Sequence, residues 1–69
     1  MKRRRVDSTN ITSIGYDERT KILEIEFNSG STYQYNNVPV SEYIKLINAD
    51  SVGKHFHQNI KNNYGFKKL

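Results

Sequence analysis

The sequence predicts a small α+β domain: a three-stranded antiparallel β-meander with two short helices packed on one face (β-β-β-α-α). Three observations support this order. Residues 21–27 alternate apolar and polar side chains, and a glycine-containing turn joins them to a tyrosine-rich segment. After Pro39, apolar residues recur at helical spacing. A chain of 69 residues has room for one domain and one core.

Two strands of the meander are recognisable from the pattern of their side chains. The first covers residues 10–16, and a polar turn separates it from the second, residues 21–27. In the second strand every other side chain is apolar and two glutamates lie between them. This alternation is typical of a strand with one face toward the core and the other toward water. The inward side chains are Leu23, Ile25 and Phe27.

A hairpin turn and a third strand follow directly. Asn28-Ser29-Gly30 predicts a three-residue loop in which Gly30 adopts a left-handed backbone conformation. The third strand, residues 31–35, then carries Tyr33 and Tyr35 on the same sheet face as the apolar side chains of the second strand. Because the helices need that face, we expect both tyrosines to form a structural core motif rather than a surface platform for stacking bases.

Two helices are predicted in the second half of the chain. Pro39 is favourable in the first turn of a helix, where its missing N–H has no partner to lose. Asp50 or Ser51 can cap the second helix. Each helix has an apolar stripe that we expect to face the sheet. These stripes are Val40, Tyr43, Ile44 and Ile47 in the first helix and Val52, Phe56 and Ile60 in the second.

Composition limits the classes of protein to which the chain can belong. It contains no cysteine, which excludes disulfides, thiol nucleophiles and cysteine metal sites and fits a reducing compartment. Its apolar runs are too short for a membrane span. Asp7 follows the basic N-terminus where a signal peptide would have an apolar segment, so we expect a soluble cytoplasmic protein without membrane contact.

Charge is distributed unevenly along the chain. The formal net charge is +4, yet all seven acidic residues lie between residues 6 and 50. Both ends are basic and contain no acid, so a polyanion should contact the ends. Glu24 and Glu26 are expected to make the outer face of the sheet acidic. The candidate nucleic-acid-binding residues are Arg3, Arg4, Arg5, Lys54, His57, Lys61, Lys67 and Lys68.

The second helix is the best candidate part of this basic surface. Lys54, His57 and Lys61 fall at i, i+3 and i+7 on its exposed side, where they can bridge successive phosphates. The same row can instead be a solvated helix face, and the basic ends can be tails that aid solubility. Gly53 can open the backbone to a phosphate or simply permit a tight turn between the helices.

No catalytic or metal centre is recognisable. His55 and His57 are two residues apart, which places them on different sides of a helix and does not fit a shared metal ion. No Ser-His-Asp order, paired-carboxylate signature or phosphate-binding loop is present. We therefore expect a non-enzymatic protein without metal, cofactor or small-molecule substrate.

A series of different short motifs extends along most of the chain, and their order and spacing are characteristic. They are Val6-Asp7-Ser8, Ile11, Ser13-Ile14-Gly15-Tyr16-Asp17, Leu23-Glu24-Ile25-Glu26-Phe27 before Gly30, Tyr33-x-Tyr35, Val38-Pro39, Tyr43, Gly53-Lys54-x-Phe56, Asn59-Ile60 and Tyr64. In this order the chain resembles the KTSC domain, which occurs at the C-terminus of some lysyl-tRNA synthetases and as a free-standing bacterial or phage protein. Gly65-Phe66 departs from the usual proline and aromatic of that family, which leaves the path of the C-terminal tail open.

The resemblance implies a single domain over residues 1–69, with a basic N-terminal tail of residues 1–6 that can be flexible. The family has no established activity that could be transferred to this chain. The suggestion of RNA binding comes only from the association of the domain with lysyl-tRNA synthetases. We therefore expect a non-catalytic module that binds nucleic acid, RNA more than DNA, through backbone charge contacts. The alternative is a protein-interaction module, for example one encoded by a phage, that binds and modulates a host enzyme or a nucleic-acid complex. A free strand edge or an exposed Tyr64 or Phe66 would serve that role.

Overall fold

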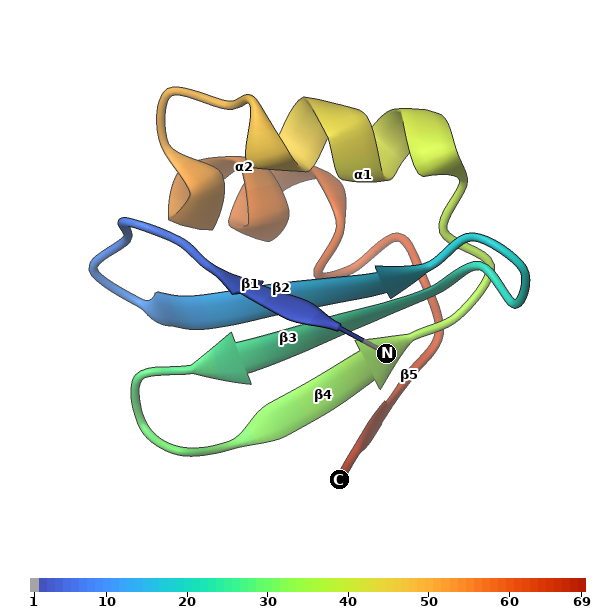
Figure 1. The fold of residues 1–69 in the computed structure, drawn as a ribbon, viewed down its shortest axis with the longest axis horizontal. Helices are drawn as coiled ribbons and strands as arrows, with labels where there is room; N and C mark the ends of the chain where they lie inside the picture. Colours follow the sequence, from blue (N-terminus) through green and yellow to red (C-terminus); the bar gives the residue numbers. More distant parts are fainter. Residues whose placement is uncertain (1) are drawn as a thin grey trace.

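A computed structural model describes residues 2–69 as two layers, with a pair of helices lying across one face of an antiparallel sheet (Figure 1). The five strands occupy the sheet in the order β1-β2-β3-β4-β5. The α+β class is confirmed, whereas the three-stranded meander is wrong because two more strands flank it. The elements are β1 (Arg3–Arg5), β2 (Ile11–Asp17), β3 (Ile22–Phe27), β4 (Thr32–Tyr35), α1 (Val40–Ile47), α2 (Val52–Asn59) and β5 (Phe66–Lys68).

Both additional strands come from the basic ends of the chain. Arg4 of β1 lies opposite Ile14, and Lys67 of β5 lies opposite Gln34. Each strand has three residues, and all of their side chains are exposed. The two strands are therefore defined by backbone hydrogen bonds to a neighbouring strand. Such bonds do not depend on the pattern of side chains, so the sequence did not predict these strands. Residues 1–6, expected as a tail that can be flexible, thus include an edge strand.

The central hairpin forms as predicted. Ile25 lies opposite Tyr33 and Leu23 lies opposite Tyr35, which confirms the predicted register. Gly30 has a φ of 97°, a left-handed conformation that costs glycine little because it has no Cβ. This register places the tyrosines on the face that the helices cover.

The core lies between the helices and the sheet. Val52, Phe56 and Ile60 are buried, which confirms the predicted inner face of the second helix. Tyr35 is 4% exposed and belongs to the same cluster. Within residues 2–69, no helix has the length and apolar composition needed to cross a bilayer. The remaining core side chains are Ile11, Ile14, Leu23, Ile25, Val38 and Leu46.

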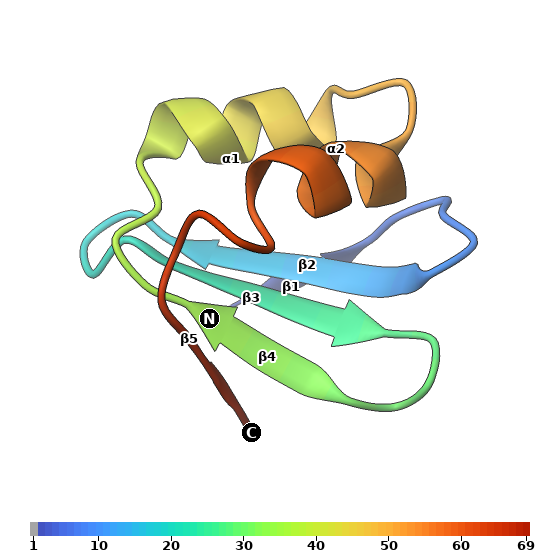
Figure 2. The same ribbon diagram turned by 180° about the vertical axis from the view of Figure 1, so that it is seen from behind.

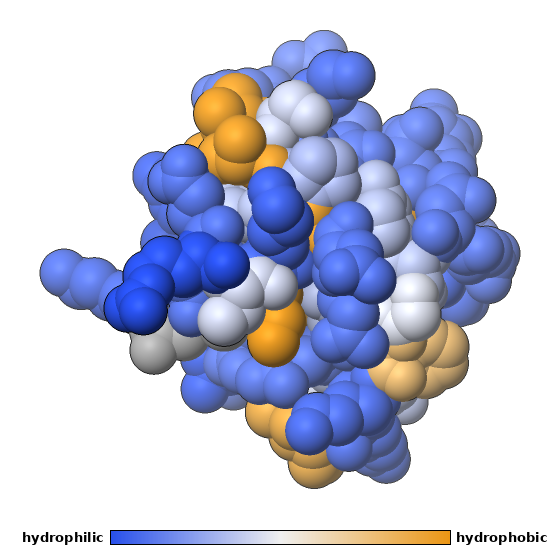
Figure 3. Space-filling view, turned by 90° about the vertical axis from the view of Figure 1, so that its right-hand side faces the viewer, coloured by the Kyte–Doolittle hydropathy of each residue, from blue (hydrophilic) through white to orange (hydrophobic). Residues whose placement is uncertain are grey.

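The first helix turns a different side to the core than its spacing predicts. Val40 and Ile44 are 38% and 49% exposed, whereas Leu46 is fully buried. Tyr43 stacks on Tyr16 of β2, with ring centroids 4.6 Å apart. Because α1 has apolar residues on more than one side, periodicity alone did not identify the buried side. Part of its apolar surface remains exposed, and Figure 3 shows a hydrophobic patch over the helix layer.

Candidate nucleic-acid interface

The rotation of α2 decides which of its side chains can reach a ligand. Ser51 caps the helix as predicted, because its Oγ accepts a hydrogen bond from the backbone N–H of Lys54 at 3.2 Å. The buried face of the helix points at the sheet. Lys54 and His57 therefore lie on its exposed side, as the spacing predicts, whereas Lys61 is exposed in the turn beyond the end of the helix.

Gly53 lies in the first turn of α2 and packs closely against the loop that follows β1. A Cβ at this position would lie 3.2 Å from the Oγ of Ser8 and 3.8 Å from Nδ2 of Asn10. A larger residue would crowd the Ser8 side chain, so close packing favours glycine here, and Gly53 also lines the groove described below.

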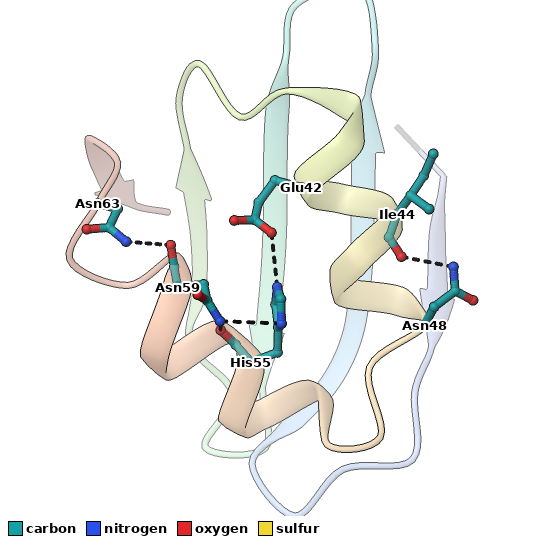
Figure 4. Close-up of polar contacts among 6 residues, drawn as sticks. All are labelled: Glu42, Ile44, Asn48, His55, Asn59 and Asn63. Carbon is teal, nitrogen blue, oxygen red and sulfur yellow. Dashed lines mark hydrogen bonds and ion pairs between the residues drawn. The ribbon is translucent and has the colours of Figure 1, made fainter.

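One polar contact joins α2 to α1, and others lie within α2 and the turn after it (Figure 4). His55 Nε2 lies 3.0 Å from Oε2 of Glu42 across the two helices. The Nδ2 of Asn59 donates to the carbonyl oxygen of His55 at 3.1 Å, and Nδ2 of Asn63 donates to the carbonyl oxygen of Asn59 at 2.7 Å. His55 therefore joins the helices, whereas His57 is exposed. Within residues 2–69, no three His, Asp or Glu side chains are grouped as metal ligands are.

An open groove of about 930 Å³ lies between α2 and the loop that joins β3 to β4. Figure 2 views the molecule from the side on which α2, β4 and β5 are near the reader. The aromatic rings that line the groove contact one another; for example, the Tyr35 and Phe56 centroids are 5.3 Å apart and the Tyr33 and Phe66 centroids 5.7 Å apart. Such tilted and edge-to-face pairs are favourable. We call these rings the aromatic floor: Phe27, Tyr33, Tyr35, Phe56 and Phe66.

The aromatic floor is partly open to solvent. Tyr35 and Phe56 are buried at its base, whereas Tyr33 and Phe27 are half-buried and Phe66 is 56% exposed. Tyr35 is thus a core residue as expected, but Tyr33 lies at the edge of the core and lines the groove. Burial raises the pKa of the Tyr35 phenol, because a low-dielectric environment disfavours the phenolate.

Polar side chains surround the aromatic floor, and we call them the rim. No acidic residue lines this groove in the described part of the chain. Lys68 lies opposite Tyr33 in the β4–β5 pair, so its side chain is on the same sheet face as that ring. The rim comprises Lys54, His57, Gln58, Lys61 and Asn62 from α2 and the turn after it, and Asn28, Ser29 and Ser31 from the hairpin loop.

The outer face of the sheet, away from the helices, has a different charge pattern. Arg3 Nε lies 3.1 Å from Oε2 of Glu24, and Arg3 Nη1 lies 3.7 Å from Oε1 of Glu26. The Nε2 of Gln34 donates to Oε1 of Glu24 at 3.0 Å. The expectation of an acidic outer face is therefore wrong, because Arg3 of β1 lies beside both glutamates, and Arg5 and Lys67 share this face.

The structure separates the predicted nucleic-acid-binding residues into groups. Lys54, His57 and Lys61 line the groove, and Lys68 lies on the groove side of β5. Strand alternation places the other cations elsewhere. Arg3, Arg5 and Lys67 are on the outer face, and Arg4 lies on the helix side of the opposite sheet edge, beside a smaller hollow.

Sequence reasoning did not identify the groove or its aromatic residues Phe27 and Phe66. The groove forms where segments distant in the chain meet: the β3–β4 hairpin, α2 and β5. The one usable signal was the strand alternation, which placed Phe27 on the same face as Tyr33. Phe66 was expected only as an exposed aromatic residue for a protein partner, and its position in the groove was not predicted because its strand was not predicted.

Comparison with known proteins assigns the chain to a family. The sequence pattern of the KTSC domain matches residues 7–64. The chain belongs to the KTSC domain family. Its fold is that of a KTSC domain protein from Yersinia pestis, whose crystal structure matches with a TM-score of 0.96 and 38% identity, covering 99% of this chain and 96% of that one.

Other relatives of this KTSC domain fall into two kinds. A protein of Stutzerimonas stutzeri (strain A1501) is 46% identical over 61 residues, which is 88% of this chain and 86% of that protein. A lysine–tRNA ligase of Nostoc punctiforme is 44% identical over 59 residues, which is 86% of this chain but 10% of the ligase. KTSC domains thus occur both in proteins of similar length and as a small part of a ligase.

Proposed function

We propose that this KTSC domain is a non-catalytic, cytoplasmic module that binds nucleic acid, RNA in preference to DNA. The observation that carries the proposal is the groove: basic and amide side chains surround aromatic rings, and no acid lies among them in residues 2–69. Phosphates favour such surroundings because lysine, histidine and amide groups donate hydrogen bonds to them without a competing carboxylate.

The cations at the groove are available to a ligand. Within the described residues, Lys54, Lys61 and Lys68 have no carboxylate partner, whereas Arg3 is paired with two glutamates. A phosphate can therefore contact the lysines without displacing an internal ion pair. If about three phosphates are contacted, the slope of log K against log salt should be roughly −2 for a single strand.

The preference for RNA draws on the relatives. Lysine–tRNA ligases of Nostoc punctiforme, Trichormus variabilis and Nostoc sp. each contain a region similar to this chain. Their named activity concerns tRNA, and a module with a basic groove is suited to an RNA partner. This support comes from association, and the groove supplies the physical part.

The test is a titration of labelled RNA and DNA oligonucleotides at two salt concentrations, read by fluorescence anisotropy. We expect binding at low salt that weakens as salt rises. The double variant Lys54→Glu/Lys61→Glu should weaken binding at least about 10-fold with little change in Tm, because both side chains are exposed. Lys21→Glu/Lys45→Glu is the control with the same change of net charge, since both lysines are exposed and neither lines the groove. Absence of salt-sensitive binding to every oligonucleotide would overturn the proposal.

A protein-interaction module is the second candidate, favoured by the exposed apolar side chains of α1. Val40 and Ile44 lie on the surface of a helix whose other side is in the core. A partner such as an enzyme or a nucleic-acid complex could cover them. Affinity capture from the native cell should then recover a partner with the wild-type chain and lose it with Ile44→Asp. Equal recovery by both chains would exclude this surface.

A further inference from the structure

Resting on the proposed function, we infer that the groove selects single strands, with unpaired bases stacking on the aromatic floor while the rim holds the phosphates. A duplex and a single strand present the same phosphates to the rim. They differ in whether a base face can leave its stack and reach the aromatic rings.

Phe66 is the main reason for this inference. The residue is 56% exposed although its ring contacts those of Tyr33 and Tyr35, at centroid distances of 5.7 and 5.6 Å. Phe66 is thus held by two tyrosines of β4, and more than half of its surface remains open to solvent. A nucleobase stacked on it would remove that surface from water and gain the stacking interaction.

The volume of the groove is sufficient for such a base. Its volume of about 930 Å³ is near the upper end of the roughly 300–1,000 Å³ typical of small-molecule sites, so a nucleotide fits. The base of the floor is closed by Tyr35 and Phe56, which are buried, while Tyr33 and Phe66 are reachable. The stacked bases of a rigid duplex cannot enter this space, so a duplex has only the rim to contact.

The polar rim can complete the contact with a splayed base. Ser29, Gln58 and Asn62 line the groove and offer both donors and acceptors. They can meet base edges or the 2′-hydroxyl of RNA, which single strands expose. The lysines favour binding of an anionic ligand through its phosphates. The aromatic and amide side chains between them can contact the bases of the same ligand.

Adjacent residues of β5 provide an internal comparison. Lys68 lies opposite Tyr33 on the groove side, whereas Lys67 lies opposite Gln34 on the outer face. The two lysines have the same charge, the same strand and exposed side chains. Lys68→Glu should therefore weaken single-strand binding several-fold, and Lys67→Glu should have a clearly smaller effect.

The decisive experiment compares three RNA probes of about ten nucleotides, within the usual site size of small single-strand-binding folds: a single strand, the same strand with abasic sites, and a duplex. The full chain should bind the single strand about 10-fold more tightly than the abasic strand or the duplex. Phe66→Ala should remove this preference while leaving abasic binding unchanged, and Phe66→Tyr should retain it. Ile44→Ala, an exposed apolar truncation on α1, is the matched control and should change nothing.

The outcomes separate the inference from the proposed function. Equal affinity for all three probes, or an unchanged preference in a folded Phe66→Ala variant, would overturn base stacking and leave backbone binding intact. Absence of binding to all three probes would instead overturn the proposed function, and the inference with it. The Tm of each variant shows that it is folded before binding is compared.

Discussion

The groove and the outer face of the sheet are both basic at their edges, yet they differ in how the charge is balanced. On the outer face, Arg3 lies between Glu24 and Glu26 and is neutralised within the molecule. In the groove, the cations surround aromatic rings, and no acid lies among the lining residues in the described chain. The number of charged residues in a sequence is therefore less informative about a binding surface than the face of the sheet on which each charged residue lies.

The largest effect should come from the base of the aromatic floor. Tyr35→Ala should lower the free energy of unfolding by about 3–5 kcal/mol, because it removes a buried ring from the core. Gln34→Ala, the adjacent residue on the outer face, should cost only about 1 kcal/mol through the loss of its hydrogen bond to Glu24. Urea denaturation measures both. Similar losses for the two variants would mean that the faces are not distinguished as described.

Tyr33→Ala should have an intermediate effect on stability. Its ring is half-buried at the edge of the core, so the loss should be about 2 kcal/mol, roughly half of that for a fully buried aromatic. The same denaturation experiment tests this order. A loss equal to that of Tyr35→Ala would place Tyr33 fully in the core and remove it from the surface available to a ligand.

Removing the ion-paired arginine of the outer face should have a smaller effect on stability. Arg3→Ala should lower the free energy of unfolding by about 1 kcal/mol, because the arginine side chain is 37% exposed and water screens its ion pairs. Arg5→Ala is the control, since Arg5 lies on the same face and forms no ion pair within residues 2–69. The difference between the losses in free energy of unfolding of Arg3→Ala and Arg5→Ala should shrink in high salt. A difference that does not depend on salt would argue against an electrostatic cause.

The smallest effect should be a loss of stability at alkaline pH that depends on Tyr35. The pKa of Tyr35 is raised above its ordinary value of about 10, so its contribution is complete below pH of about 10 and is lost as pH rises through the folded-state pKa. Thermal unfolding from pH 8 to 11 should show a steeper decline for wild type than for Tyr35→Phe. Parallel curves would show that burial does not disfavour this phenolate.

The sequence was most informative for strands and helices in which burial of one face gives the side chains a regular apolar period. The alternation in β3, the register fixed by the Gly30 hairpin and the buried side of α2 were all predicted, because burial imposes a period on each. In α1 the period was ambiguous, and Leu46 rather than Ile44 is in the core.

The parts that could not be predicted depend on partners distant in the chain. β1 and β5 exist through backbone hydrogen bonds to β2 and β4, which their exposed side chains do not reveal. The groove likewise needs α2, the hairpin loop and Phe66 together. The basic residues of the candidate site were therefore predicted as a set, while their division between two faces required the structure.

The basic edge strands also affect how copies of the domain meet one another. An outermost strand offers free backbone groups to which a second molecule could add its own strand. Here those positions belong to Arg3–Arg5 and Phe66–Lys68, so two molecules approaching edge to edge bring Arg4, Arg5, Lys67 and Lys68 together. Electrostatic repulsion then opposes self-association along the sheet. The ends of the chain thus complete the sheet and at the same time discourage its growth into a larger aggregate.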